Sequence, residues 1–210
     1  MAYAVKEAFL TLQGEGVQAG RRAVFLRFAG CNLWSGREED RRKAVCQFCD
    51  TDFVGTDGVG GGKFADAEAL SRHVAALWGE ESERRLVVVT GGEPMLQLDR
   101  ALVDALHGHN FQIAVESNGT IPATAGIDWL CISPKAGSDV VQRSGDELKL
   151  VWPQAGIDLA AIEQWDFANF LVQPMDCADR AGAMAAAIAL AMERPRWRLT
   201  LQAHKIVGLP

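Results

Sequence analysis

The chain has 210 residues and a mass of 22.7 kDa, which fits one ordinary domain with a single core. Hydrophobic residues make up 49% of the chain and charged residues 23%, a balance that excludes a disordered protein. The formal net charge of −6 argues against nucleic acid as a partner, because phosphate contacts need clustered Lys and Arg.

The sequence also argues against secretion and membrane insertion. Residues 1–12 have no basic segment followed by an apolar core, so no signal peptide is expected. The longest apolar run, near residues 181–192, is too short and too Ala-rich to span a bilayer. We therefore expect a cytoplasmic protein. Its five cysteines would lie in a reducing compartment, where they indicate metal ligation or catalysis before disulfides.

Seven strands and three helices are predicted along the chain. In chain order they are a strand over 23–28, a helix after an N-cap at Asp66, a strand over 86–90, a helix from Leu98 to Gly108, strands over 111–116, 128–133, 148–152 and 170–173, a helix over 178–192, and a strand over 197–201. Most strands are near-continuous apolar runs, which is typical of parallel strands covered on both faces.

Two connections between strands lack a helical pattern. Residues 117–127 join two strands in eleven residues, and residues 134–147 are broken by Pro, Gly and Ser. A parallel crossover normally needs a dozen or more residues, and a full eight-fold barrel about 250. The sequence therefore predicts an α/β fold: a single domain over residues 1–210 that forms an abbreviated, partial β/α barrel with few helices.

Polar residues collect where the predicted strands end. In parallel α/β folds these ends meet at one mouth, which is where the functional site lies. The residues are Arg27, Thr90 to Glu93, Glu116, Asn118, Ser133, Lys135, Gln173, Gln202 and His204.

Three cysteines have the spacing of metal ligands. Cys46 and Cys49 form a C-x2-C pair, and Cys31 precedes Cys46 with fourteen residues between them. Soft thiolates suit zinc or an iron–sulfur cluster, but a structural zinc site needs four ligands. Cys131 lies in an apolar strand and is expected in the core, and no role is assigned to Cys177. An iron–sulfur cluster with three protein ligands is therefore favoured.

Three thiolates on a 4Fe–4S cluster leave one iron open to the amino and carboxylate groups of S-adenosylmethionine (SAM). Reduction of its sulfonium then supplies a 5′-deoxyadenosyl radical, which abstracts a hydrogen atom. The segment from Thr90 to Pro94 supports this chemistry. Gly91 and Gly92 allow close approach of backbone to a ligand, and Glu93 can accept hydrogen bonds from an ammonium group.

These motifs resemble the radical SAM superfamily and, within it, the 7-carboxy-7-deazaguanine synthase family. The blocks that carry the resemblance are residues 12–16, 27–33, 49–51, 90–94, 116–120, 133–135 and 204–205. The commoner superfamily motif is C-x3-C-x2-C. Here residues 32–45 form an insertion in the cluster loop, and its charged run over 37–43 is expected to be a solvated excursion. Thiolates need to be close in space rather than in sequence, so the insertion is compatible with a cluster.

The resemblance implies the reaction and its partners. The substrate would be 6-carboxy-5,6,7,8-tetrahydropterin, whose ring contracts with loss of ammonia to give 7-carboxy-7-deazaguanine. This carbon–nitrogen lyase step leads to 7-deazapurines such as queuosine. The cofactors would be a 4Fe–4S cluster, SAM and Mg²⁺. The partners would be the pterin, a second copy in a homodimer and a flavodoxin-like electron donor, with no nucleic acid or membrane.

The resemblance also implies residue roles on the cofactor side, with no catalytic residue beyond the cluster and SAM. The cluster ligands are Cys31, Cys46 and Cys49. Phe48 packs near the SAM adenine, Gly91 and Gly92 bring backbone close to SAM, and Glu93 holds its amino group. Its ribose and carboxylate are assigned to Asn118, Ser133, Lys135 and Gln173.

On the substrate side, Arg27 is expected to pair with the pterin carboxylate and Glu116 to accept from its guanidine-like edge. The hydroxyl of Thr51 is expected on Mg²⁺, with Asp50 as its rival. Residues 202–210 are expected to fold back over the mouth, since nine extended residues reach up to ~30 Å. The full substrate-binding set is Leu12, Gln13, Gly14, Glu15, Gly16, Arg27, Glu116, His204 and Pro210, the last through its terminal carboxylate.

Two other functions compete with this interpretation. A glycyl-radical-enzyme activase would share the cluster and the Thr90 to Pro94 segment, but it leaves residues 13–16 unexplained. A small iron–sulfur or zinc-binding module would need a fourth ligand and leaves the polar strand ends without a purpose.

Overall fold

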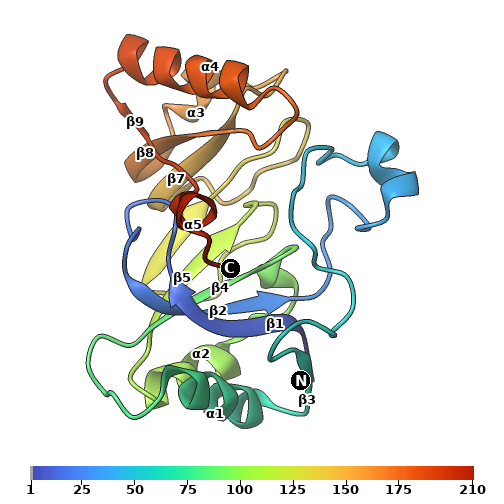
Figure 1. The fold of residues 1–210 in the computed structure, drawn as a ribbon, viewed down its shortest axis with the longest axis vertical. Helices are drawn as coiled ribbons and strands as arrows, with labels where there is room; N and C mark the ends of the chain where they lie inside the picture. Colours follow the sequence, from blue (N-terminus) through green and yellow to red (C-terminus); the bar gives the residue numbers. More distant parts are fainter. Residues whose placement is uncertain (1) are drawn as a thin grey trace.

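The computed structural model describes residues 2–210 and contains one curved, nine-stranded sheet (Figure 1). The strands are β1 (Tyr3–Leu12), β2 (Arg22–Phe28), β3 (Gly62–Phe64), β4 (Leu86–Gly91), β5 (Gln112–Ser117), β6 (Trp129–Ile132), β7 (Ser144–Trp152), β8 (Asp166–Pro174) and β9 (Trp197–Leu199). Their order is β3-β1-β2-β4-β5-β6-β7-β8-β9. All neighbours from β2 to β9 are parallel, whereas β1 runs antiparallel to β2 and β3.

The predicted partial barrel is confirmed, and all seven predicted strands are present. Two strands were missed, β1 and the short β3. The last strand ends at Leu199, two residues before its predicted end. β1 escaped prediction because its apolar residues do not alternate strictly, since the register shifts between Val5 and Glu7.

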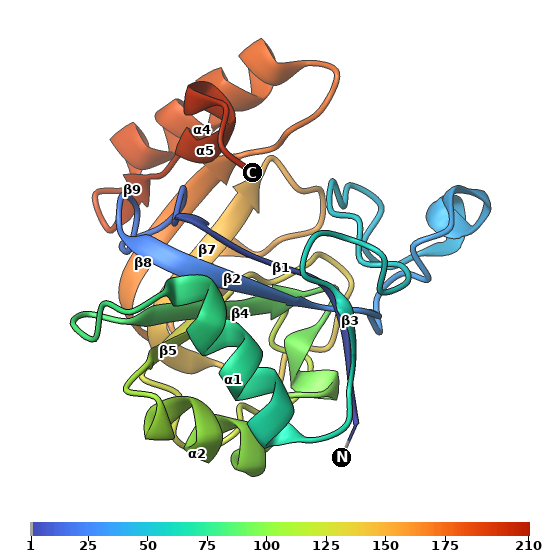
Figure 2. The ribbon, with the colours of Figure 1, turned by 60° about the horizontal axis from the view of Figure 1, so that its bottom comes forward.

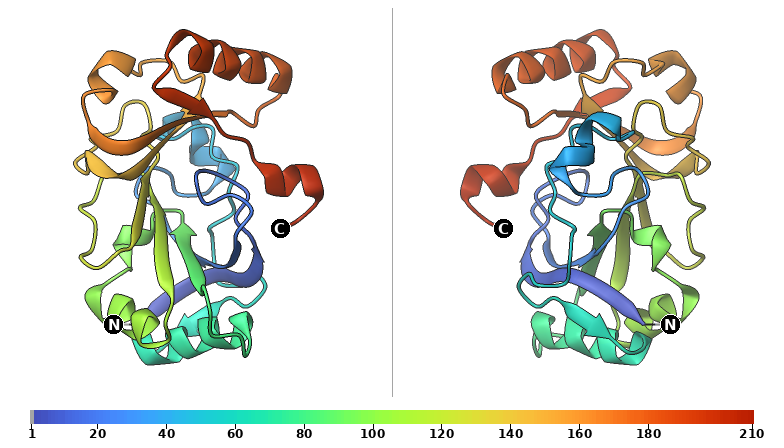
Figure 3. Two further views of the ribbon diagram at one scale, coloured as in Figure 1. Left: turned by 90° about the vertical axis from the view of Figure 1, so that its left-hand side faces the viewer. Right: turned by 90° about the vertical axis from the view of Figure 1, so that its right-hand side faces the viewer.

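The three predicted helices are α1 (Ala67–Trp78), α2 (Arg100–Gly108) and α4 (Arg180–Glu193). Asp66 caps α1 as expected, since its carboxylate accepts from the Ala69 N–H at 2.8 Å. Asp99 caps α2 in the same way, so this helix starts after Leu98. Figures 1 and 3 show α1 and α2 together at one end of the molecule and α4 at the other.

Four short helical segments were not predicted: α3 (Leu159–Ile162), α5 (Ala203–Val207) and the 3-10 helices η1 (Glu38–Lys43) and η2 (Pro94–Leu96). As expected, no helix lies between β5 and β6 or between β6 and β7. None of the helices in residues 2–210 is long and apolar enough to cross a membrane.

The two faces of the sheet have different side chains. On β2, Val24, Leu26 and Phe28 belong to the main core, whereas Ala23 packs with a smaller cluster that includes Val88 and Ala114 on the other face. Residues on this inner face become polar toward the carboxyl ends of the strands. Arg27 lies beside Thr90 in the β2–β4 register, and Glu116 lies beside Cys131 in the β5–β6 register. The parallel strands therefore carry polar groups into the mouth of the partial barrel.

The insertion at residues 32–45 leaves the body of the protein (Figure 2). Its 3-10 helix η1 has no buried residue, which confirms the predicted solvated excursion. Arg41 nevertheless returns to the cluster loop, where its Nη1 donates to the carbonyls of Gln47 and Cys49, both at 3.1 Å. Its guanidinium also lies 4.0 Å from the centre of the Trp34 ring. The insertion is thus tied to the loop that carries the second and third cysteines.

Candidate functional site

A cavity of about 420 Å³ opens at the carboxyl ends of the parallel strands. The structure brings all but three of the predicted site residues to its lining. The lining members of that set are Leu12, Gln13, Glu15, Arg27, Cys31, Cys46, Phe48, Cys49, Thr51, Gly91, Gly92, Glu116, Asn118, Ser133, Lys135, Gln173, His204 and Pro210. The three exceptions are Gly14, Gly16 and Glu93. Residues from strands far apart in the sequence therefore converge on one site.

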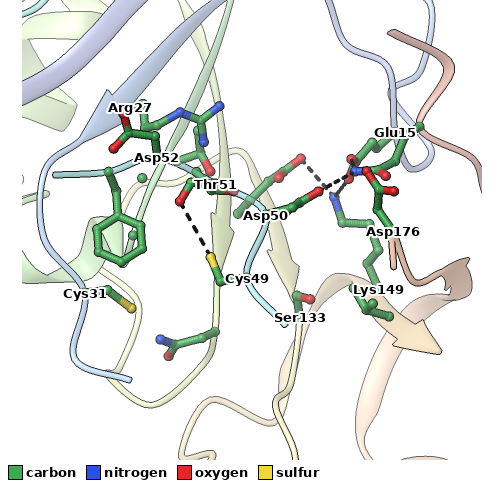
Figure 4. Close-up of a pocket in the computed structure, with 18 of the residues that line it drawn as sticks. Glu15, Arg27, Cys31, Cys49, Asp50, Thr51, Asp52, Ser133, Lys149 and Asp176 are labelled. Carbon is green, nitrogen blue, oxygen red and sulfur yellow. Dashed lines mark hydrogen bonds and ion pairs between the residues drawn. The ribbon is translucent and has the colours of Figure 1, made fainter. Parts of the chain in front are cut away.

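The cysteines that line this cavity are Cys31, Cys46 and Cys49. Figure 4 shows the first and the last of them. A hydrogen bond from the Cys46 thiol lowers the pKa of Cys49 to about 6, so Cys49 is the more readily ionised of the pair. Cys131 is buried, and burial raises its pKa well above the usual range. Cys177 precedes α4 outside the cavity lining. The structure therefore separates three candidate ligands from two other cysteines.

The donor set suits a 4Fe–4S cluster. Among residues 2–210, no group of three or more His, Cys, Asp or Glu side chains is placed to hold a single metal ion. Thiolates on a cubane bind different irons, so they need not meet at one point. Three soft sulfurs facing one cavity match the preference of iron–sulfur clusters.

The glycines after β4 allow the cluster loop to lie against the strand end. An added Cβ at Gly92 would lie 2.6 Å from Cys31 Cβ and would also collide with the Gly30 carbonyl oxygen. The Glu93 N–H donates to that same carbonyl at 2.9 Å. Gly92 therefore fixes the position of Cys31 through close backbone contact.

We expect Gly92→Ala to displace the Cys31 loop and to lower the iron bound per protein after anaerobic reconstitution. Overpacking of this kind also costs about 1–3 kcal/mol of stability, measurable as a lower Tm. Gly108→Ala is the matched control, because an added Cβ at Gly108 meets no atom within 4 Å. Normal iron content in Gly92→Ala would contradict the proposed packing.

Glu93 is held by hydrogen bonds within the protein. Its side chain is completely buried, outside the cavity lining. Its carboxylate accepts hydrogen bonds from the Ser117 hydroxyl (2.8 Å), the Asn118 N–H (2.8 Å) and the Met95 N–H (3.0 Å). Glu93 thus ties the end of β5 to the turn after β4. The contact predicted between this carboxylate and the SAM amino group stays a prediction.

The other residues predicted for SAM lie in the cavity beside the cysteines. Lys135 Nζ donates to the carbonyl and hydroxyl oxygens of Ser133, both at 2.7 Å, and lies 5.9 Å from the centre of the Phe48 ring. Asn118 binds Asn32 through its side-chain N–H at 3.0 Å. Gln173 Oε1 is buried and has no hydrogen-bond partner among residues 2–210. A buried, unpaired acceptor in a cavity lining indicates a ligand that donates to it.

Charged groups from separate segments meet on the substrate side. Lys149 Nζ lies 2.5 Å from Glu15 Oε2 and 3.2 Å from Glu116 Oε1 (Figure 4). Gln13 Nε2 also donates to Glu116 Oε1, at 3.0 Å. Burial favours the neutral form of Glu15, but the charge and hydrogen bond of Lys149 outweigh it and lower its pKa to about 2. Glu15 is therefore held as a carboxylate.

Lys149 was not predicted as a site residue from the sequence. It is buried, lines the cavity and lies on β7 between two core leucines. The available signal was a single basic residue inside the apolar run over 148–151. Such a residue on a strand faces the side opposite to its apolar neighbours, which here is the inside of the partial barrel.

Arg27 already has one carboxylate partner within the protein. Its Nε donates to Glu7 Oε1 at 2.7 Å. Glu7 lies beside Arg27 in the antiparallel β1–β2 register, so the missed strand supplies this partner. Arginine has five N–H donors, so four remain for a second carboxylate in the cavity.

Gly14 and Gly16 do not line the cavity, and they allow neighbouring side chains to pack closely against the backbone. An added Cβ at Gly14 would collide with the His204 side chain, and one at Gly16 would collide with the Glu147 carboxylate. The Gly14 carbonyl accepts from the Ala203 N–H at 2.9 Å, which seats α5 beside the cavity. The tail is therefore helical rather than extended as expected, and it still brings His204 and Pro210 to the cavity lining.

Thr51 and its rival Asp50 differ in their partners. Thr51 lines the cavity two residues after Cys49 (Figure 4). Asp50 Oδ2 lies 2.7 Å from Lys205 Nζ on α5, so this carboxylate is already paired. This difference favours Thr51 over Asp50 as a ligand for an added ion.

Comparison with known proteins identifies the family. No family model matches the chain. A 7-carboxy-7-deazaguanine synthase from Caulobacter vibrioides is 61% identical over all 210 residues of both chains. The chain belongs to the 7-carboxy-7-deazaguanine synthase family. A synthase from Bordetella pertussis is 58% identical, again over the full length of both chains.

A solved structure agrees with the family assignment. QueE from Escherichia coli superposes with a TM-score of 0.69 at 25% identity, covering 97% of this chain and 95% of that one. The family resemblance predicted from the sequence blocks is confirmed. In this member of the 7-carboxy-7-deazaguanine synthase family, the cavity at the strand ends is therefore the candidate active site.

Proposed function

We propose that this protein is a radical SAM lyase that converts 6-carboxy-5,6,7,8-tetrahydropterin into 7-carboxy-7-deazaguanine with loss of ammonia. The observation that carries the proposal is the single cavity, in which three cysteines face a set of charged side chains suited to a pterin carboxylate. Full-length identity of 61% to a named synthase supports it. The product belongs to the 7-deazapurine pathway that includes queuosine.

The residues divide the cavity into a cofactor side and a substrate side. When bound, the 4Fe–4S cluster and SAM supply a 5′-deoxyadenosyl radical for hydrogen abstraction. Cys31, Cys46 and Cys49 hold the cluster. The lining residues available to SAM are Phe48, Gly91, Gly92, Asn118, Ser133, Lys135 and Gln173.

The substrate side binds and orients the pterin. Arg27 pairs with its carboxylate, because a guanidinium offers two parallel N–H donors to such a group. Glu116 accepts N–H donors from the guanidine-like edge of the ring. His204 and Pro210 reach the cavity from the C-terminal segment, and Leu12 reaches it from the end of β1.

The activity is tested by anaerobic incubation of reconstituted enzyme with the tetrahydropterin, SAM, Mg²⁺ and a reductant, followed by mass analysis. We expect 7-carboxy-7-deazaguanine and ammonia. A glycyl-radical-enzyme activase would cleave SAM without forming this product. A zinc or iron–sulfur binding module would not cleave SAM at all.

The Mg²⁺ site is proposed at Thr51, whose position beside Cys49 supports it. Mg²⁺ takes few ligands from proteins and keeps waters, so one hydroxyl is a sufficient anchor. We expect Thr51→Ala to raise the Mg²⁺ concentration that gives half-maximal activity about tenfold. Thr56→Ala, in the same loop but outside the cavity lining, is the control. An unchanged metal titration in Thr51→Ala would favour Asp50 instead.

The proposal extends to partners and location. It includes a homodimer, a flavodoxin-like electron donor and a cytoplasmic location. Sedimentation of the purified protein tests the dimer, and SAM cleavage driven by reduced flavodoxin tests the donor.

A further inference from the structure

A row of charged side chains crosses the inner face of β5, β6 and β7. Glu116, Cys131 and Glu147 are register partners on these three strands, so their side chains point to the same face. Lys149 is two residues beyond Glu147 on β7 and therefore shares that face. Both Glu116 and Lys149 line the cavity. The carboxylate of Glu116 and the ammonium group of Lys149 therefore face the same cavity.

The two carboxylates that contact Lys149 are not equivalent. Both carboxylate oxygens of Glu15 have partners within the protein, because Oε2 pairs with Lys149 and Oε1 accepts from Gln202 Nε2 at 2.9 Å. Glu116 uses only Oε1, which faces Lys149 at 3.2 Å and Gln13 at 3.0 Å. No residue within 2–210 binds Glu116 Oε2. Glu15 is therefore a positioning residue, whereas Glu116 keeps one oxygen for a cavity ligand.

Lys149 also keeps one donor. An ammonium group has three N–H donors. Within residues 2–210, Lys149 Nζ contacts two acceptors, Glu15 and Glu116. The remaining N–H is buried, because the side chain is only 5% exposed. A buried charged donor is costly without an acceptor, so the ligand is expected to provide one beside the Glu116 oxygen.

We propose that Lys149 is a specificity-determining residue that selects a ring with an oxygen beside an N–H donor. Glu116 Oε2 accepts the ring N–H, and the third N–H of Lys149 donates to the neighbouring ring oxygen. This inference rests on the proposed function and deepens it, because the 4-oxo edge of a pterin presents this donor and acceptor side by side. A 4-amino ring inverts this pattern. It presents a ring-nitrogen lone pair to Glu116 and an N–H donor to Lys149, so the ammonium group is left without its third acceptor.

The test measures binding with the reconstituted, SAM-loaded protein under anaerobic conditions. The probes are 6-carboxy-5,6,7,8-tetrahydropterin and its 2,4-diamino counterpart, each titrated to obtain a Kd. We expect the natural protein to bind the 4-oxo probe at least about tenfold more tightly than the 2,4-diamino probe. A tenfold difference in Kd corresponds to the free energy of about one hydrogen bond to a charged group. Lys149→Met should lower this ratio clearly by weakening binding of the 4-oxo probe, and the preference that remains is the one that Glu116 contributes through the ring N–H.

A second variant distinguishes loss of the Lys149 contact from failure of the protein to fold. Lys149→Met leaves Glu15 and Glu116 without their shared cation, so K149M is also made together with E15Q, which restores the local charge. E15Q alone retains Lys149 and should keep the ratio. Lys63→Met is the matched control, because Lys63 is an exposed lysine on β3 outside the cavity.

The possible outcomes separate the inference from the proposed function. A lowered ratio in the K149M/E15Q variant and a normal ratio in E15Q and Lys63→Met support the role of Lys149. An unchanged ratio in K149M/E15Q overturns it, as does a lack of preference in the natural protein. If the natural protein neither binds nor converts the 4-oxo tetrahydropterin, the proposed function itself is wrong.

Discussion

Alanine at Cys31, Cys46 or Cys49 is expected to abolish the cluster and all SAM cleavage that depends on it. All three residues line one cavity, and two of them sit in a loop that Arg41 holds through the carbonyls of Gln47 and Cys49. A cubane with two protein thiolates lacks a ligand on a second iron and is not retained. Iron and sulfide content, the visible absorbance of the reconstituted protein and SAM cleavage on reduction measure the loss.

Cys131→Ala and Cys177→Ala are the matched controls for this prediction. Cys131 is buried, with its thiol 3.5 Å from Glu147 Oε1, and Cys177 lies before α4 outside the cavity lining. Both variants should bind iron and cleave SAM as the natural protein does. Loss of the cluster in Cys131→Ala together with its retention in Cys31→Ala would show that the ligand assignment is wrong.

The parallel part of the fold was predictable because its strands are covered on both faces. Burial on two sides requires apolar residues at successive positions, and such runs are visible without any knowledge of the partner strands. β1 is different, because its edge beyond β2 pairs only with the short β3 and with residues of a loop. Lys6 on β1 is buried yet satisfied by the Val54 carbonyl and by Asp52 and Asp57, all from a distant loop. A strand whose polar residues find partners at long range has no periodic signal in its own sequence.

The same limit explains the errors in the site. Strand-end positions followed from topology, so most of the lining could be predicted. The partner of Arg27 could not, because Glu7 reaches it through the strand that was missed. The partners of Glu93 could not be predicted either, because its carboxylate accepts from the Ser117 hydroxyl and the Asn118 N–H of a separate strand end. Contacts of this kind depend on which segments meet, and a single sequence does not reveal that.

Arg27→Ala is expected to impair turnover severely while SAM binding persists. Arg27 lies on the inner face of β2 with its side chain 18% exposed, so a substrate carboxylate paired with it is largely desolvated. Removing one partner of such a pair costs roughly 2–5 kcal/mol, about 30-fold to several thousand-fold in kcat/KM. Arg27→Lys should recover only part of the activity, because an ammonium group lacks the two-pronged geometry of a guanidinium.

Arg22→Ala is the control for Arg27, because it removes the same side chain from the other end of the same strand. Arg22 donates to the Trp78 carbonyl and lies 4.5 Å from the centre of the Trp78 ring, away from the cavity lining. Its loss should affect Tm rather than kcat/KM. In Arg27→Ala, Glu7 is 27% exposed and can be solvated, so the fold should survive the loss of its partner. A folded Arg27→Ala protein with unchanged kcat/KM for the tetrahydropterin would therefore rule out the pairing with the substrate carboxylate.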